Sequence, residues 1–250
     1  MMKRLVTVVL AVLAVWSVMA QEAAGDGALA QAREAYALRA DPVKAKAAVD
    51  LFAAAAKADP SSYAARWEGA KACYYYGTWA RPDMDDDDKL VLFQDGIDRA
   101  KAAVALKADG AEGHFWLGVL YGVYGETKGI FKSLSMVPGI KEEMAQCMKL
   151  DPAVEGYGPD RVLGRLYYKL PGFKGGDNDK AIEHLEASVK GAPTNALTRL
   201  YLAEVYKSER MKDKALEQVR FIIAMTPDER WAPEHDSIKT QAEALLKKLE

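Results

Sequence analysis

Apolar and small residues recur along this chain with a helical period, and in several stretches they follow one longer spacing. In the window that opens at Ala196, large residues stand at positions 7 and 11, small residues at 8 and 20, and a proline at 32. Those positions hold, in chain order, Leu202, Ala203, Tyr206, Ala215 and Pro227. Small residues let two antiparallel helices approach closely, and the proline ends the second helix. The window therefore predicts a helical hairpin.

Further copies of this spacing lie upstream. They comprise Leu163, Gly164, Tyr167, Ala181, Leu185 and Pro193; Leu117, Gly118, Tyr121, Met144, Cys147 and Pro152; and Ala48, Phe52, Ala55 and Pro60. The spacing is that of the tetratricopeptide repeat (TPR). We expect an all-α, TPR-like solenoid of about five helical hairpins that forms a single domain over residues 21–250. Ile238, Ala242, Leu245 and Leu249 share one face of a last helix, about 233–249, which would cap the open end.

Only the last repeat has the standard length. The closing residues Pro60, Ala108, Pro152, Pro193 and Pro227 are 48, 44, 41 and 34 positions apart. The excess must therefore lie in turns or lengthened helices. One such place is residues 170–177, a loop rich in glycine and proline that ends in Asp177, which can cap the next helix.

Four glycines, Gly118, Gly122, Gly125 and Gly129, follow one another at spacings of 4, 3 and 4. This spacing would put all four on one helix face, and each costs the helix roughly 1 kcal/mol relative to alanine. Close packing of a neighbouring helix would explain the stripe, and so would a smooth wall for a ligand or channel. The sequence leaves both interpretations open.

The N-terminus has the layout of a secretory signal peptide over residues 1–20. Lys3 and Arg4 precede an uncharged apolar run, and small residues stand before a cleavage site that follows Ala20. No cysteine follows that site, so lipidation there is not expected. Removing residues 1–20 changes the net charge from −2 to −4, which argues against a nucleic-acid partner. We expect a periplasmic or secreted product with no transmembrane segment in the mature chain. An uncleaved membrane anchor is the alternative, although the apolar run is short for a membrane span.

In such a superhelix, the first helix of each hairpin lines the concave groove. Its inward positions hold Trp67, Lys71, Tyr74, Phe115, Arg161, Arg165, Tyr168 and Lys207. Arg161 and Arg165 are four residues apart on one face, where they repel each other unless an anion or an acid lies between them. A carboxylate-bearing ligand or peptide would satisfy both guanidinium groups. Internal acids such as Glu112 or Glu126 could do so instead.

The sequence gives only weak indications of a disulfide, a metal site or a catalytic site. Cys73 and Cys147 fall in different helix pairs, which favours buried free thiols over a disulfide. Asp83, Asp85 and Asp87 alternate as in a calcium loop, but the positions that need glycine and glutamate hold other residues. An acidic turn that caps the next helix is the favoured interpretation. No catalytic constellation, cofactor motif or metal-ligand spacing is evident, so we expect no enzyme, no cofactor and no metal.

Two segments, residues 113–134 and 163–176, resemble the TatT family, the TPR-like T component that accompanies periplasmic TRAP transporters. The resemblance implies an all-α periplasmic protein with an apolar pore or groove. It also implies association with a TRAP substrate-binding subunit that carries small organic acids. We therefore expect a binding or adaptor protein for an organic acid or amphipathic ligand. The alternative is a generic TPR scaffold that docks another envelope protein, and a homo-oligomer is compatible with either.

Overall fold

The structure is a computed structural model that describes residues 25–250, and every regular element within that range is helical. The predicted signal peptide, residues 1–20, lies outside the described residues. A first helix covers residues 25–37. The later elements are α2 (Pro42–Ala58), α3 (Tyr63–Tyr75), η1 (Tyr76–Ala80), α4 (Asp86–Leu106), α5 (Ala111–Lys128), α6 (Ile130–Leu150), α7 (Val154–Lys169), η2 (Gly172–Lys174), α8 (Asn178–Gly191), α9 (Ala196–Ser208), α10 (Lys212–Ala224) and α11 (Ala232–Leu249). The predicted all-α fold is confirmed.

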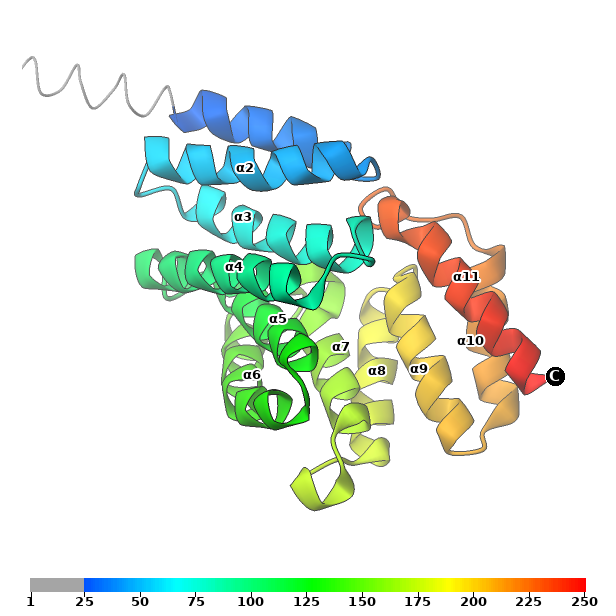
Figure 1. Ribbon diagram of the computed structural model, residues 1–250. Helices are drawn as coiled ribbons and strands as arrows, with labels where there is room; N and C mark the ends of the chain where they lie inside the picture. The colour runs from blue at the N-terminus through cyan, green and yellow to red at the C-terminus, as the bar shows by residue number, and fades with distance from the viewer. Residues whose placement is uncertain (1–24) are drawn as a thin grey trace, which may run out of the picture.

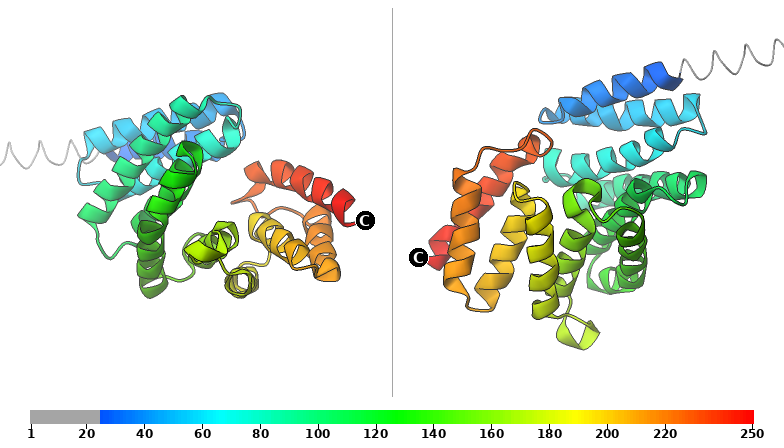
Figure 2. Two further views of the ribbon diagram at one scale, coloured as in Figure 1. Left: turned by 60° about the horizontal axis from the view of Figure 1, so that its bottom comes forward. Right: turned by 180° about the vertical axis from the view of Figure 1, so that it is seen from behind.

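Consecutive helices pack as antiparallel pairs, which follow one another along a curve (Figure 1). The pairs are helix 25–37 with α2, α3 with α4, α5 with α6, α7 with α8, and α9 with α10. Helix α11 packs against α10 and α9 and closes the series. Figure 2 shows the curve from two other sides, with the first pairs and the last helices forming its two arms. The predicted solenoid of about five hairpins and a cap is therefore present.

Polar side chains begin many of these helices. The carboxylate of Asp41 accepts from the Val43 amide at 2.8 Å, that of Asp85 from Asp87 at 2.9 Å, and that of Asp177 from Lys180 at 3.1 Å. Each bond satisfies an amide that the helix leaves free in its first turn. The predicted cap at Asp177 is confirmed, and the acidic turn before α4 supplies a cap as well.

The standard repeat at the C-terminus has a continuous apolar core. Leu185, Leu202, Val219 and Ile222, from α8, α9 and α10, are each at most 2% exposed. Helix α11 buries Ile238, Ala242, Leu245 and Leu249 against the same core, as predicted for the cap. Burial of this face is what holds α11 in place.

The glycine stripe does not lie on one face of one helix, because Gly129 ends α5 with a φ of +106°. A Cβ on Gly118 would lie 2.5 Å from Met144 Cε, and one on Gly125 would lie 2.9 Å from Ser133 Cα. Those two glycines allow α6 to pack closely. Gly122 has only Ile140 Cδ1 near it, at 4.0 Å. The stripe therefore combines a helix contact with a stretch of open wall.

Two further observations concern cysteines and membranes. Cys73 and Cys147 are buried free thiols, as predicted, and burial raises the pKa of each to about 12. Among residues 25–250, no helix combines the length and apolar character that a membrane span requires.

Candidate functional site

A cavity of about 870 Å³ lies inside the curve of the solenoid. Its walls come from helix 25–37, α3, η1, α5, α6, α7, α9 and α11 and from the loops beside them. Six of the predicted groove residues line it: Trp67, Lys71, Tyr74, Phe115, Arg161 and Arg165. The structure places the other two outside the lining. Tyr168 points its hydroxyl at the Glu204 carbonyl oxygen, 3.5 Å away, and Lys207 is exposed on α9.

The two arms of the solenoid meet across this cavity. Arg39, between helix 25–37 and α2, donates to the Arg230 carbonyl oxygen at 2.5 Å and lies 3.7 Å from the Glu234 carboxylate. The start of α11 lies beside the start of α2 in Figure 1. Arg39 is only 7% exposed, and its guanidinium lies over the rings of Tyr36 and Tyr75. The contact closes the curve into a ring around the cavity.

Helix α7 begins with a left-handed turn at the cavity wall. Glu155, Gly156 and Tyr157 have φ values of +50°, +66° and +54°, and regular helix resumes after them. Left-handed conformation costs L-residues roughly 1–2 kcal/mol each, so the surrounding packing must hold the turn. Trp231 supplies part of that packing, because a Cβ on Gly156 would lie 2.7 Å from its ring.

The turn directs backbone carbonyl groups at Arg161. The guanidinium donates to the carbonyl oxygens of Glu155, at 3.3 Å, and Gly156, at 3.4 Å. No ion pair joins Arg161 to an acid anywhere in the part of the chain that the structure describes, Glu112 and Glu126 included. Burial lowers the pKa of this guanidinium, which means that its charge is poorly solvated. Arg161 is therefore a cation at the cavity wall that no described acid neutralises by direct pairing.

Arg165 differs from Arg161. It pairs with the carboxylate of Glu204 on α9, and its guanidinium carbon lies 4.1 Å from the centre of the Tyr201 ring. Among the described residues, the two arginines thus do not share one acidic side chain. Glu112 and Glu126, the acids suggested by the sequence, form no ion pair with either arginine in the described chain. The acid that pairs with Arg165 is Glu204, which belongs to the next repeat.

Lys71 occupies an aromatic corner of the cavity. Its ammonium pairs with the Glu155 carboxylate at 2.8 Å and lies 5.4 Å from the Trp116 ring centre and 6.0 Å from that of Trp67. Tyr36 is a third ring at 5.8 Å. This pair ties α3 to the left-handed turn and leaves the aromatic faces as apolar wall.

Sequence reasoning missed several residues of the cavity. Arg39, Glu155, Tyr201, Trp231 and Glu234 all line it. Glu155 is followed by Gly156, Gly158 and Pro159, and such a cluster of helix-breaking residues signals an irregular backbone. Nothing local in the sequence signals the contact between Arg39 and Arg230, which are 191 positions apart, because it depends on the curvature of the whole solenoid.

Metal ligands do not gather in this site. Among residues 25–250, no group of three or more histidine, cysteine, aspartate or glutamate side chains could hold a metal ion. His114 pairs with Glu143 at 2.6 Å, and His184 with Asp160 at 2.7 Å, between helices of the same hairpin. These histidines join the helices of their hairpins.

Comparison with known proteins supports the fold. Residues 28–171, more than half of the chain, match the family model described as "RMD1-3: Regulator of microtubule dynamics protein 1-3". No curated protein sequence matches the chain. The resemblance to the TatT family finds no support in these comparisons.

Two similar solved structures are described as TPR proteins. The TPR protein TTC0263 of Thermus thermophilus is 20% identical, with a TM-score of 0.65 over 89% of this chain and 99% of that chain. YrrB, "a TPR protein with an unusual peptide-binding site", is 13% identical, with a TM-score of 0.43 over 80% and 84% of the two chains. At 20% identity the likeness to TTC0263 concerns the fold alone, and it confirms the TPR-like solenoid.

Proposed function

This chain belongs to the family described as regulator of microtubule dynamics protein 1-3, and we propose that it is a non-enzymatic binding protein whose central cavity receives an anionic, amphipathic ligand. The ligand class is a small organic acid with an apolar part, or a carboxylate-bearing peptide end. The proposal rests on the cavity of this chain and not on the activity in the family's description.

Arg161 is the observation that carries the proposal. A guanidinium at a cavity wall, with backbone carbonyl groups as its hydrogen-bond partners in the described chain, retains donor groups and charge for a guest. Its planar fork matches a carboxylate. The other predicted groove cations that line the cavity are already paired, Lys71 with Glu155 and Arg165 with Glu204.

The remaining walls suit an apolar body. Trp67, Trp116, Val119, Val162 and Tyr201 all line the cavity. Ligand pockets typically have volumes of about 300–1,000 Å³, mostly apolar walls and a few placed polar groups. The cavity, at about 870 Å³, has the size of such a pocket, and its apolar residues stand beside charged side chains of both signs.

In its finer form, the proposal places the protein in the periplasm as an accessory component of a TRAP-type organic-acid uptake system. The predicted signal peptide supports that location. The two segments that resemble the TatT family contribute Gly118, Gly122, Arg165 and Leu170 to the cavity lining. A TRAP substrate-binding subunit would then be the partner, and a generic envelope scaffold is the alternative.

Calorimetric titration with straight-chain carboxylic acids of increasing length tests the cavity. We expect binding that strengthens with chain length and falls at least tenfold in Arg161→Gln, because charge-assisted hydrogen bonds contribute about 1.5–3 kcal/mol each. Arg220→Gln, on the exposed face of α10, is the matched control and should bind as the wild type does. Equal affinity in the two variants would contradict the proposal.

Co-purification from an envelope extract tests the finer form. A TRAP substrate-binding subunit should be retained by the wild-type protein under conditions in which the acids bind. Retention of other envelope proteins alone, with no binding of acids, would support the generic scaffold instead.

A further inference from the structure

Three large apolar side chains are exposed at one end of the molecule, and we call them the apolar rim: Ile130, Phe131 and Phe173. Their exposed fractions are 61%, 88% and 84%, and the two phenylalanines are the most exposed large apolar residues in the described chain. They stand at the turn between α5 and α6 and in the loop between α7 and α8. Because these side chains are exposed, the fold does not need them to be apolar.

The two turns lie at the same end because of the helix order. Helix α6 starts at the first turn, α7 returns antiparallel beside it, and α7 ends at the second. Lys141 on α6 lies 4.8 Å from the centre of the Tyr167 ring on α7, which shows that the two helices lie side by side. In Figure 1 this end is the lower edge, below the labels of α6 and α7.

The rim also borders the cavity. Ile130 and Leu134 line it from α6, and Leu170 and Pro171 line it from the loop after α7. The rim turns themselves protrude freely, because a Cβ added to Gly129, Gly172 or Gly175 would meet nothing within 4 Å. The apolar side chains therefore stand on exposed turns next to residues that line the cavity.

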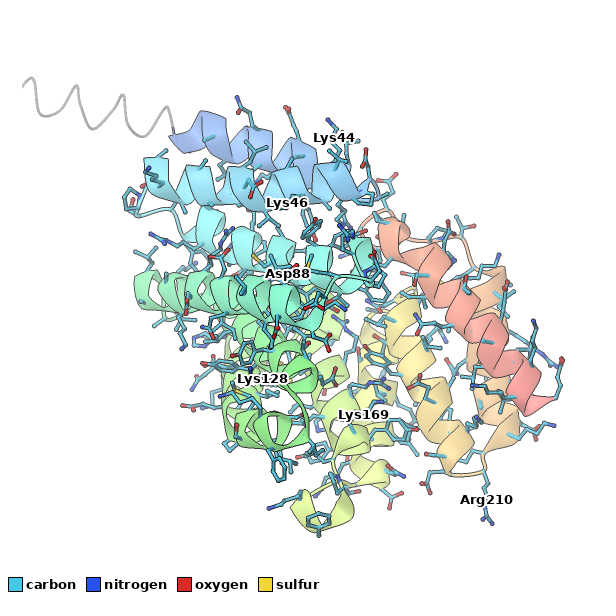
Figure 3. The ribbon with its side chains drawn as sticks, viewed as in Figure 1. Lys44, Lys46, Asp88, Lys128, Lys169 and Arg210 are labelled. Carbon is cyan, nitrogen blue, oxygen red and sulfur yellow. The ribbon has the colours of Figure 1, made fainter. Side chains whose placement is uncertain are left out.

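Positive charge surrounds these turns. Lys128, Lys132, Lys169 and Lys174 are all exposed and flank the rim. None of the four forms an ion pair with an acid among the described residues, and Figure 3 shows Lys128 and Lys169 in the lower half of the molecule. Asp177 is occupied by capping α8 and by its pair with Lys180, at 3.2 Å. Glu126 and Asp179 are the exposed acids nearest to the two turns in sequence, so the four lysines leave a local positive excess in a chain of net charge −2.

We propose that the apolar rim docks on an anionic lipid bilayer, with Phe131 and Phe173 inserted at the interface and the four lysines against lipid phosphates. Apolar side chains with flanking cations bind such surfaces by partitioning and by electrostatic attraction together. A protein partner is the poorer fit, because protein hot spots are centred in well-packed patches, whereas these side chains project separately from two turns. Docking in this orientation would bring the part of the cavity lining formed by Ile130, Leu134, Leu170 and Pro171 close to the lipid surface.

Vesicle co-sedimentation with the full chain tests the proposal. Wild-type protein should bind vesicles that contain phosphatidylglycerol more strongly than vesicles of phosphatidylcholine alone, and added salt should weaken the difference because it screens the lysines. Phe131→Ser with Phe173→Ser should lower the bound fraction at least tenfold. Both side chains are exposed, so this variant should melt as the wild type does.

Two matched controls isolate the rim. Val43→Ser with Val91→Ser removes apolar side chains that are 74% and 71% exposed on α2 and α4, and it should leave binding unchanged. Lys128→Gln with Lys169→Gln should reduce binding to anionic vesicles, whereas Lys44→Gln with Lys46→Gln, on α2 in the upper part of Figure 3, should not. The N-terminal apolar run is identical in all variants, so it cannot produce these differences.

Three results would overturn the proposal: no preference for anionic vesicles, equal losses in rim and control variants, or loss of a protein partner in the phenylalanine variant with vesicle binding intact. The measurement needs no cavity ligand. Failure of the rim proposal would leave the proposed binding function standing, and the converse also holds.

Discussion

The C-terminal repeat and the middle of the solenoid use the same hairpin in different ways. In α9, α10 and α11, the pattern has its standard spacing, and residues such as Leu202, Val219 and Ile238 merge into one core. In α5 to α7 the repeats are longer, and beside their own apolar core they present glycines, a left-handed turn and charged groups to the cavity. The first region closes the fold, and the second provides the wall of the cavity.

This difference shows where a repeat protein can place a site. Where the spacing is regular, helices pack face to face, and α9 contributes only Leu197 and Tyr201 to the cavity lining. Where a repeat is lengthened or its backbone leaves the helical region, carbonyl groups and side chains face the interior, as those of Glu155 and Arg161 do. Departures from the repeat are therefore the places to look for function.

Removal of α11, from the regular C-terminal region, should have the largest effect on the stability of the protein. A chain that ends before Pro233 would lose the burial of Ile238, Leu245 and Leu249, at about 1.5–3 kcal/mol each, against a typical total stability of about 5–15 kcal/mol. We expect the melting temperature to fall by more than about 10 °C, or the chain not to fold. Thermal unfolding followed by circular dichroism measures this.

The control keeps α11 and changes only its exposed face. Lys247→Gln with Lys248→Gln alters two exposed side chains and should melt within a few degrees of the wild type. A truncated chain that melts like this control would show that α11 does not cap the core.

The fold could be predicted from the sequence because the repeat pattern is local. Most hairpins show their own small residues and a closing proline, so the order of the elements and the capping helix followed directly. The helix boundaries of the lengthened repeat could not be predicted from the sequence. The spacing of Gly129 places it on the glycine stripe of a helix, whereas its φ of +106° shows that α5 ends there.

The cavity could be predicted only in part. Inward repeat positions identified Trp67, Lys71 and Arg161 as lining residues. The partner of Arg165 was missed, because Glu204 belongs to the following repeat, and the angle between repeats decides which side chains meet. The Arg39 contact was missed for the same reason, at a larger distance in sequence.

Gly156→Ala tests whether the left-handed turn is held by packing. The new Cβ would lie 2.7 Å from the Trp231 ring, in a backbone conformation that already costs an L-residue roughly 1–2 kcal/mol. We expect about 2–4 kcal/mol of destabilisation and weaker binding of the acids, because the carbonyl groups that position Arg161 would shift. Gly175 has a φ of +90° and open space around it, so Gly175→Ala should lose only the stability that the left-handed backbone costs an L-residue. Chemical denaturation compares the two, and equal losses would mean that Trp231 does not support the turn.

The smallest effects should come from two glycines of α5 that differ by three positions. In Gly125→Ala, the new Cβ would lie 2.9 Å from Ser133 Cα, a backbone atom that cannot rotate away, so overpacking should cost about 1–3 kcal/mol. In Gly122→Ala, the nearest atom is Ile140 Cδ1 at 4.0 Å, and the higher helix propensity of alanine should stabilise the protein by up to roughly 1 kcal/mol. Gly122→Leu would extend into the cavity and should weaken binding of the acids while the protein stays folded. Denaturation should show that the free energy of unfolding falls in Gly125→Ala and rises in Gly122→Ala. This difference would distinguish the packing face from the cavity wall within one helix, and a change of the same sign in both variants would refute that division.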